Sequence, residues 1–486
     1  MQRFIIICLL LFCASHVSAQ SKSVSQDSLK LTSPNGGEIF FIGSDTVITW
    51  TGIPLTDTVK LEYSSDAGSS WNFITDKATG GSYQWHVPKA VSDSCLVRVE
   101  EIETSYNWAV DAEFADSSSS DGNTVVTDLE GNIFVVGCFI GKVKFGTTQL
   151  TSSQRNIFLA KYDPLGNVLW AKNIGGNQCE NSIALDSTGN IYITGYFEGT
   201  AYFDGVSLVS NSGSEDIFIA KYTRDGNLIW VQKAGGNGIN VATSIATDAL
   251  GNAYITGAPN FISKYRPDGS VEWVRQVMPN LSSYSYGTGV AISYDGLDLY
   301  ITGSFDSIIA LNSTNCGFVT RYHSDGSFVW SKIITPNIRP VHSTEPYRSA
   351  GIAIDGSENI YITGGYTDDL NLDTILFKHE LAFNESFIIA KYDLNGNIQW
   401  VKKIDEYPYY YGGDCTGYNI VADNFGNIFV SGIFGDSIIV FANDTLKNSG
   451  WNDTFVAKFQ SDGKVLWEKK QEALLMMRAM ELQLIH

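Results

Sequence analysis

The chain has 486 residues, with 52 acidic against 32 basic side chains and a formal net charge of −20. This length exceeds one ordinary hydrophobic core, so we expect several domains or a repeat array. The acidic balance argues against nucleic acid and anionic membrane surfaces as partners, because both need clustered basic charge.

The N-terminus carries the features of a secretory signal. Arg3 supplies a positive charge, residues 4–12 form a short apolar core, and small residues precede Gln20 as a cleavage site. We therefore expect residues 1–19 to be removed and residues 20–29 to form a linker. No later stretch approaches the roughly eighteen continuous apolar residues of a membrane-spanning helix, which predicts a secreted or cell-surface protein.

Residues 30–100 read as seven or so short strands between Gly, Asp and Pro turns, a pattern typical of a β-sandwich. Residues 33–38, 48–50, 82–85 and 95–99 resemble the immunoglobulin-like domain named for Ser/Thr-rich GPI-anchored yeast wall proteins. That resemblance implies an accessory module of a secreted protein, and it implies no activity.

Residues 64–71 of this module fit the S-x-D-x-G-x-[ST]-W pattern of the sialidase Asp box. We interpret the pattern as a hairpin turn in which Asp66 ties backbone N–H groups, Gly68 adopts a positive φ and Trp71 anchors the returning strand. A sialidase would also need clustered arginines for a substrate carboxylate, and the arginines here are dispersed.

A degenerate repeat of roughly sixty residues fills positions 101–470. Its clearest copy starts at Ser182, and each copy predicts four strands, with residues 183–186, 191–195, 218–223 and 228–233 as strands A to D. Short Gly-containing turns join A to B and C to D, which is the layout of a β-propeller blade. A tryptophan that should fill the gap between adjacent blades closes each copy, at Trp108, Trp170, Trp230, Trp273, Trp330, Trp400 and Trp467.

The repeats resemble the bacterial SBBP β-propeller repeat family, whose pattern D-x-x-GN-x-Y-x-TG…AKYD-x-x-GN-x-xW recurs through most of the chain. Membership would imply a propeller and export, and no reaction. We therefore expect an all-β protein: a small immunoglobulin-like sandwich followed by a six- to seven-bladed propeller of four-stranded blades, the last one incomplete.

The array starts with a lone D strand at Trp108 and then runs through six A–B–C–D units. A lone first D strand is typical of a ring that is closed by strands from both ends of the array. Residues 471–486 form a Met/Leu-rich tail without blade features. One hypothesis is a frameshift within the preceding lysine codons, because a shifted frame can encode the next loop and strand A; the alternative is a genuine amphipathic tail.

No catalytic, metal or cofactor motif stands out. The five histidines after the signal lack HExxH, HxH or CxxH spacing, and the Asp-rich turns lack the alternating oxygen ligands of a calcium loop. The five remaining cysteines are scattered, which favours buried thiols over a disulfide framework and leaves one chance bridge open. They are Cys95, Cys138, Cys179, Cys316 and Cys415.

The D–A and B–C loops emerge on one face of the propeller, vary in length and are the expected binding surface. Three D–A loops carry the candidate ligand-binding tyrosines: Tyr284, Tyr286, Tyr347, Tyr407, Tyr409, Tyr410 and Tyr411. Tyrosine suits saccharide or protein contacts, although these rings could equally plug the channel or pad blade seams. We expect a non-catalytic protein that binds a polysaccharide or an extracellular protein; the alternatives are a glycan-active lyase or hydrolase and a purely structural matrix component.

Overall fold

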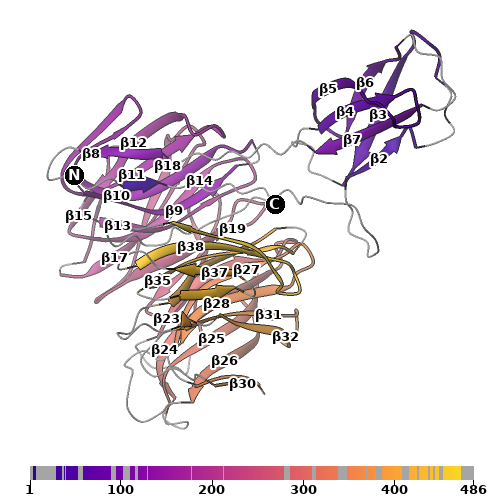
Figure 1. Ribbon diagram of the computed structural model, residues 1–486. Helices are drawn as coiled ribbons and strands as arrows, with labels where there is room; N and C mark the ends of the chain where they lie inside the picture. Colours follow the sequence, from indigo (N-terminus) through magenta and orange to yellow (C-terminus); the bar gives the residue numbers. More distant parts are fainter. Residues whose placement is uncertain are drawn as a thin grey trace. The chain divides into compact units, whose positions relative to one another are not determined.

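The computed structural model describes two compact units, one within residues 7–109 and one that runs from Val110 onward and includes β1 (Phe4–Ile6) (Figure 1). All secondary structure in the described residues is β-strand, as predicted. These residues contain no helix of the length and apolar character needed to cross a membrane. The described residues are 4–6, 29–35, 38, 40–52, 59–88, 95–101, 110–114, 119–128, 130–176, 178–211, 213–278, 285–308, 313–337, 347–366, 369–373, 375–378, 386–404, 406–407, 415–423, 426–435, 438–441, 444–447 and 452–471.

The first unit is a sandwich of two three-stranded antiparallel sheets. Alternating side chains of both sheets meet in a small core that includes Ile48, Trp50, Leu61 and Trp85. One sheet has the order β2 (Lys30–Ser33), β3 (Asp45–Thr51), β6 (Ser82–His86), and the other β5 (Asn72–Ala78), β4 (Val59–Ser64), β7 (Leu96–Glu101).

The Asp66 turn between β4 and β5 is structural, as predicted. Asp66 accepts hydrogen bonds from the Ser70 backbone N–H at 2.8 Å and the Ser70 hydroxyl at 2.6 Å. These bonds lower the pKa of Asp66 to about 2, so the carboxylate that holds the turn is ionised at neutral pH. Gly68 has a φ of 90°, and the Arg98 guanidinium lies over the Trp71 ring at 4.2 Å.

The second unit contains six four-stranded antiparallel meanders within the described residues, which we number blades 1 to 6 in chain order. In each blade the strands follow the predicted order A–B–C–D from the innermost strand outward. Blade 1 is β9 (Ser119–Thr127), β10 (Ile133–Phe145), β11 (Thr148–Tyr162), β12 (Val168–Gly176); blade 2 is β13 (Gln178–Leu185), β14 (Ile191–Glu198), β17 (Glu215–Tyr222), β18 (Leu228–Ala234); blade 3 is β19 (Val241–Thr247), β20 (Ala253–Ala258), β21 (Phe261–Tyr265), β22 (Val271–Gln276); blade 4 is β23 (Ser285–Ile292), β24 (Asp298–Ile308), β25 (Ser313–His323), β26 (Phe328–Asn337); blade 5 is β27 (Tyr347–Ile354), β28 (Ile360–Tyr366), β31 (Ser386–Tyr392), β32 (Ile398–Ile404); blade 6 is β34 (Cys415–Ala422), β35 (Ile428–Gly435), β38 (Asn452–Phe459), β39 (Val465–Gln471).

The A–B and C–D turns are built alike because the same backbone hydrogen bonds close them. In blade 2 the Gly189 N–H donates to the Asp186 carbonyl at 2.8 Å, and the Gly226 N–H donates to the Thr223 carbonyl at 2.8 Å. Both glycines have φ of 78°, a conformation that glycine adopts without the Cβ penalty of other residues. One face of the propeller unit is therefore a set of near-identical tight turns.

The repeated tryptophans join each blade to the next one. Trp230 donates its indole N–H to the Pro267 carbonyl in the C–D turn of blade 3 at 3.0 Å, and Trp400 donates to the Ser461 carbonyl of blade 6 at 3.0 Å. Trp273 and Trp330 make the equivalent bonds, to the Ser324 and Leu394 carbonyls. Each of these indoles thus bridges two blades, as the sequence predicts.

The first and last tryptophans of the described array differ from these four. Trp170 lies against the C–D turn of blade 2, where a Cβ built on Gly226 would come within 3.2 Å of its ring. Trp467 in blade 6 has a buried indole nitrogen with no hydrogen-bond partner among the described residues. Most of these rings are only half-buried, so they seal the outer part of the blade seams; Trp108 lies outside the described residues.

The B–C connections carry extra hairpins that lean on the preceding blade. β29 (Asp369–Leu372) of blade 5 pairs with the end of β26 in blade 4 and turns back as β30 (Ile375–Phe377), while blade 2 carries β15 (Thr200–Phe203) and β16 (Val206–Val209). In blade 6, β36 (Ile438–Phe441) pairs with β37 (Asp444–Lys447) and with β33 (Glu406–Tyr407), which follows blade 5. Blade 3, the short 43-residue repeat, has only Pro259 and Asn260 between β20 and β21.

Strand β8 (Val110–Phe114) follows the position of Trp108 and pairs with the long hairpin of blade 1, with Phe114 in register with Val143. This pairing matches the way β26 meets β29 at the junction of blades 4 and 5. On its other edge β8 pairs with β1, with Phe4 in register with Ala112.

Candidate functional site

The six A strands surround one central cavity of about 560 Å³. The A strands of consecutive blades contact one another, from β9 and β13 through to β27 and β34. One register position contributes a small apolar residue from every blade to the cavity wall: Val126, Ala184, Ala246, Ala291, Ala353 and Val421. The predicted radial arrangement of the sheets around a shared hub is thereby confirmed.

The hydroxyl groups in the cavity wall mainly hold the blades together. The Thr243 hydroxyl donates to the Gly287 carbonyl at 2.7 Å, and the Thr247 hydroxyl donates to the Leu185 carbonyl at 2.7 Å. Each bond links blade 3 to one of its neighbours. These side chains therefore satisfy backbone groups of the scaffold and present few free donors to a ligand.

The charged groups of the cavity wall gather where the A–B turn of blade 1 meets the C–D turn of blade 2. Arg224 contacts Glu130 at 2.6 Å and Asp128 at 3.7 Å. The hydrogen bond and charge of Arg224 lower the pKa of Glu130, so this carboxylate stays ionised and paired with Arg224 at neutral pH. This group is a salt-bridge cluster between two blades.

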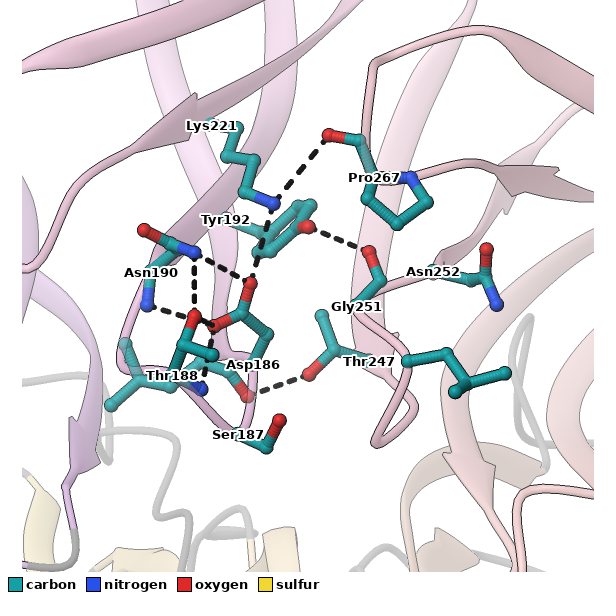
Figure 2. Close-up of polar contacts among 12 residues, drawn as sticks. Asp186, Ser187, Thr188, Asn190, Tyr192, Lys221, Thr247, Gly251, Asn252 and Pro267 are labelled. Carbon is teal, nitrogen blue, oxygen red and sulfur yellow. Dashed lines mark hydrogen bonds and ion pairs between the residues drawn. The ribbon is translucent and has the colours of Figure 1, made fainter.

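A buried ion pair lies at the junction of blades 2 and 3, as Figure 2 shows. Lys221 on β17 contacts Asp186 in the A–B turn at 3.3 Å, reaches the Pro267 carbonyl of blade 3 at 3.5 Å, and sits 4.7 Å from the centre of the Tyr192 ring. The Tyr192 hydroxyl in turn donates to the Gly251 carbonyl of blade 3 at 2.6 Å. These side chains thus hold blades 2 and 3 against each other.

The carboxylate of Asp186 is strongly held. Burial by itself would raise the pKa of Asp186, but hydrogen bonds from Thr188 and Asn190, with the nearby Lys221 ammonium, lower it overall. The carboxylate also accepts the Thr188 and Asn190 backbone N–H groups at 3.0 and 2.9 Å. Turn chemistry therefore accounts for these aspartates, and no metal-binding group of three or more ligands occurs within the described ranges.

Blade 4 contains the one arrangement among the described residues in which a histidine, an arginine and a carboxylate meet. Asp298 accepts hydrogen bonds from Arg321 at 2.6 Å and pairs with His323 Nδ1 at 2.8 Å. In this blade Ser293 takes the turn position that Asp186 holds in blade 2, and Arg321 takes the position of Lys221. The Asp298–Arg321 ion pair thus corresponds to the Asp186–Lys221 pair of blade 2, except that the carboxylate comes from the start of strand B instead of the start of the A–B turn.

The structure describes the backbone positions of three of the predicted tyrosines. Tyr286 on β23 is 38% exposed and pairs with Ser304. Tyr347 on β27 pairs with Tyr366. In blade 4 the equivalent register position is held by Ser285, so Tyr347 and Tyr286 differ by one position along their strands. Tyr407 lies on β33, which pairs with the insertion hairpin of blade 6. The other four, Tyr284, Tyr409, Tyr410 and Tyr411, lie outside the described residues.

Reasoning from the sequence missed a second hollow, on the rim between blades 1 and 2. It has a volume of about 290 Å³, and its one aromatic side chain is Tyr202 on β15. The signal was present in the B–C insertion, where Tyr202 stands between Ala201 and Phe203 in a period-two pattern that buries its neighbours and exposes it.

No family model matches the chain. An uncharacterized WD repeat-containing protein of Acanthamoeba polyphaga mimivirus is 27% identical over 425 residues, which are 75% of this chain and 28% of that protein. The regulatory protein FlaEY of Caulobacter vibrioides is 26% identical over 140 residues, which are 27% of this chain and 15% of that protein. The matched regions thus span less than a third of either relative.

Two solved structures cover most of the chain at low similarity. BamB from Moraxella catarrhalis has a TM-score of 0.38 and 10% identity, covering 76% of this chain and 93% of that one. The Dos1 propeller has a TM-score of 0.38 and 9% identity, covering 74% and 86%. The repeated four-stranded sheets and their shared cavity identify this chain as a β-propeller repeat protein.

Proposed function

We propose that the protein is an exported, non-catalytic binding protein that holds a polysaccharide or an extracellular protein on the variable face of its propeller. In this proposal the N-terminal sandwich is an immunoglobulin-like spacer or second binding module. The repeats belong to the SBBP type, and the N-terminal signal directs export.

The contrast between the two faces of the propeller carries this proposal. On one face, the A–B and C–D turns repeat the same closed geometry from blade to blade. On the other face, the connections range from two residues in blade 3 to a whole hairpin in blades 2, 5 and 6. A rigid scaffold that varies on one face only is the usual design of a binding protein.

The state of the charged groups favours binding over catalysis. A general acid or base must be free to exchange a proton with its substrate. The described carboxylates that line the cavity are instead held by turn N–H groups or by partners such as Arg224 and Lys221. The polar groups near the hub thus serve the scaffold, which leaves recognition to the loops.

A binding comparison between the two faces tests the proposal. The protein would be screened on a glycan array and against extracellular proteins of its source, with the triple variant Tyr409→Ala, Tyr410→Ala, Tyr411→Ala alongside. The matched control is Leu165→Ser with Leu250→Ser, two exposed apolar residues on the uniform turn face. We expect the tyrosine variant to lose binding and the leucine variant to keep it; retention by the tyrosine variant contradicts the proposal.

We also infer that β8 is the outermost strand of a seventh blade between blades 6 and 1. Its pairing with the blade 1 hairpin follows the pattern of an ordinary blade junction. The Trp467 indole nitrogen, which has no partner among the described residues, supports the same reading, since the next blade in the ring supplies the acceptor for the four tryptophans before it. Removal of residues 1–19 would free the edge of β8 that β1 occupies.

A further inference from the structure

The rim hollow between blades 1 and 2 has a wall of neutral polar side chains. Its floor comes from the blade 1 strands β11 and β12, and its side comes from the blade 2 hairpin β15–β16. Its polar residues are Ser152, Ser153, Gln154, Asn156 and Asn173, and no charged side chain lines it. A ligand with a formal charge would find no counter-charge there, so the lining selects a neutral, hydroxyl-rich molecule.

The two asparagines are held in a fixed orientation. Asn156 donates its side-chain amide N–H to the Asn173 side-chain oxygen at 3.1 Å, and that oxygen also accepts the Gly175 backbone N–H at 3.4 Å. The Asn173 oxygen is thereby used within the protein, which leaves its NH₂ group and the Asn156 oxygen for a ligand. One donor and one acceptor side by side match a sugar hydroxyl, which both donates and accepts.

Tyr202 is held at the edge of the hollow as an exposed ring. Its side chain is 63% exposed, whereas Ala201 and Phe203 on either side are each 1% exposed. Phe203 anchors the hairpin, because its ring lies 5.0 Å from that of Phe218 and it occupies the space beside Gly175, where a Cβ would come within 3.2 Å. An exposed aromatic ring on an anchored strand offers a flat apolar surface at little loss of conformational entropy.

The outer face of this hairpin continues the apolar surface. Val209 pairs with Thr200 and therefore shares the face of Tyr202, and it is 60% exposed. A chain of sugar units could rest its C–H faces along Tyr202 and Val209 and place one ring in the hollow. The volume of about 290 Å³ is at the small end for ligand sites, which suits one part of a polymer rather than a large compact ligand.

We propose that the rim hollow is a binding subsite for a neutral hexose unit of a polysaccharide, with Tyr202 as the stacking platform and the Asn156–Asn173 pair as the hydroxyl-recognition group. This proposal rests on the proposed binding function and names both its ligand class and a place for it. It is separate from the tyrosine-rich D–A loops.

The test uses the full chain and an array of neutral and anionic oligosaccharides, followed by calorimetric titration with the neutral tetrasaccharide that binds best. Tyr202→Ala should weaken binding about tenfold, Tyr202→Phe should keep most of the affinity, and Asn173→Ala should weaken it about tenfold. The matched control is Tyr294→Ala, a tyrosine of similar exposure (65%) in an A–B turn on the opposite face. That control should bind as the unchanged protein does.

The outcomes separate this subsite from the general function. Equal binding by Tyr202→Ala and Tyr294→Ala, or binding of anionic glycans only, overturns the subsite. If the triple variant at Tyr409, Tyr410 and Tyr411 still abolishes binding in that case, the proposed function stands and only the rim subsite is wrong. If the protein binds neither glycan nor extracellular protein, both proposals fall together.

Discussion

The contact between each tryptophan and the next C–D turn makes a quantitative prediction at Gly269. This glycine has a φ of 86°, and a Cβ built on it would lie 2.9 to 3.2 Å from three atoms of the Trp230 indole, a rigid group of the preceding blade. Gly269→Ala should therefore incur a left-handed backbone penalty of about 1–2 kcal/mol and an overpacking penalty of about 1–3 kcal/mol. The expected total loss in the free energy of unfolding is about 2–5 kcal/mol.

Two comparisons separate the backbone penalty from the clash. Gly205, in the β15–β16 turn, has a φ of 92° and nothing within 4 Å of its built Cβ, so Gly205→Ala should lose only about 1–2 kcal/mol. In a Trp230→Ala background, Gly269→Ala should also fall to about 1–2 kcal/mol, because the indole is gone. Urea unfolding followed by circular dichroism measures all four variants. A penalty for Gly269→Ala that is the same with and without Trp230 would refute the reasoning.

Two further predictions follow from the blade junctions. Asp186→Asn should destabilise the protein by about 3–5 kcal/mol at pH 7, because it leaves Lys221 buried without its charged partner. Since the folded pKa of Asp186 is lowered, its stabilising effect is present above the unfolded value of about 3.9 and is lost as the pH falls through the folded value. Urea midpoints at pH 7, 5 and 3 should therefore show the difference between the two proteins shrinking below about pH 4, and a constant difference would contradict the argument. Trp400→Phe should lose about 1 kcal/mol more stability than Trp467→Phe, since within the described residues the Trp400 indole N–H has an acceptor and that of Trp467 has none; equal losses would show that the Ser461 hydrogen bond contributes nothing or that Trp467 finds its acceptor in a seventh blade.

The repeat architecture was predictable because its signals are local. Gly189 and Gly226 mark turns whose positive φ few other residues adopt, and the strands between such turns are short and apolar. The recurring tryptophans predicted the repeat, and the apolar runs between the turns predicted the order of the four strands in each copy. The Asp66 hairpin was predictable for the same reason, since its hydrogen bonds span only four residues.

The candidate site was less predictable because it depends on register between strands far apart in sequence. Lys221 meets Asp186 and the Pro267 carbonyl only when three strands and the next blade are aligned. Tyr286 and Tyr347 were predicted in D–A loops, yet they lie on the A strands β23 and β27, one register position apart. The position of Tyr202 could not be predicted from the repeat pattern, because Tyr202 lies on the inserted β15–β16 hairpin.

Distances between spin labels across the cavity would show whether the sheets surround one axis. Labels would be placed in pairs at Val126 of blade 1 and at Ala246, Ala291 or Val421, which all line the cavity. In a ring, the Val126–Val421 distance is shorter than the Val126–Ala291 distance, because the last blade comes back toward the first. In a linear pile with about 10 Å between sheets, the Val126–Val421 distance would instead be the longest, at about 50 Å, and that result would contradict the account.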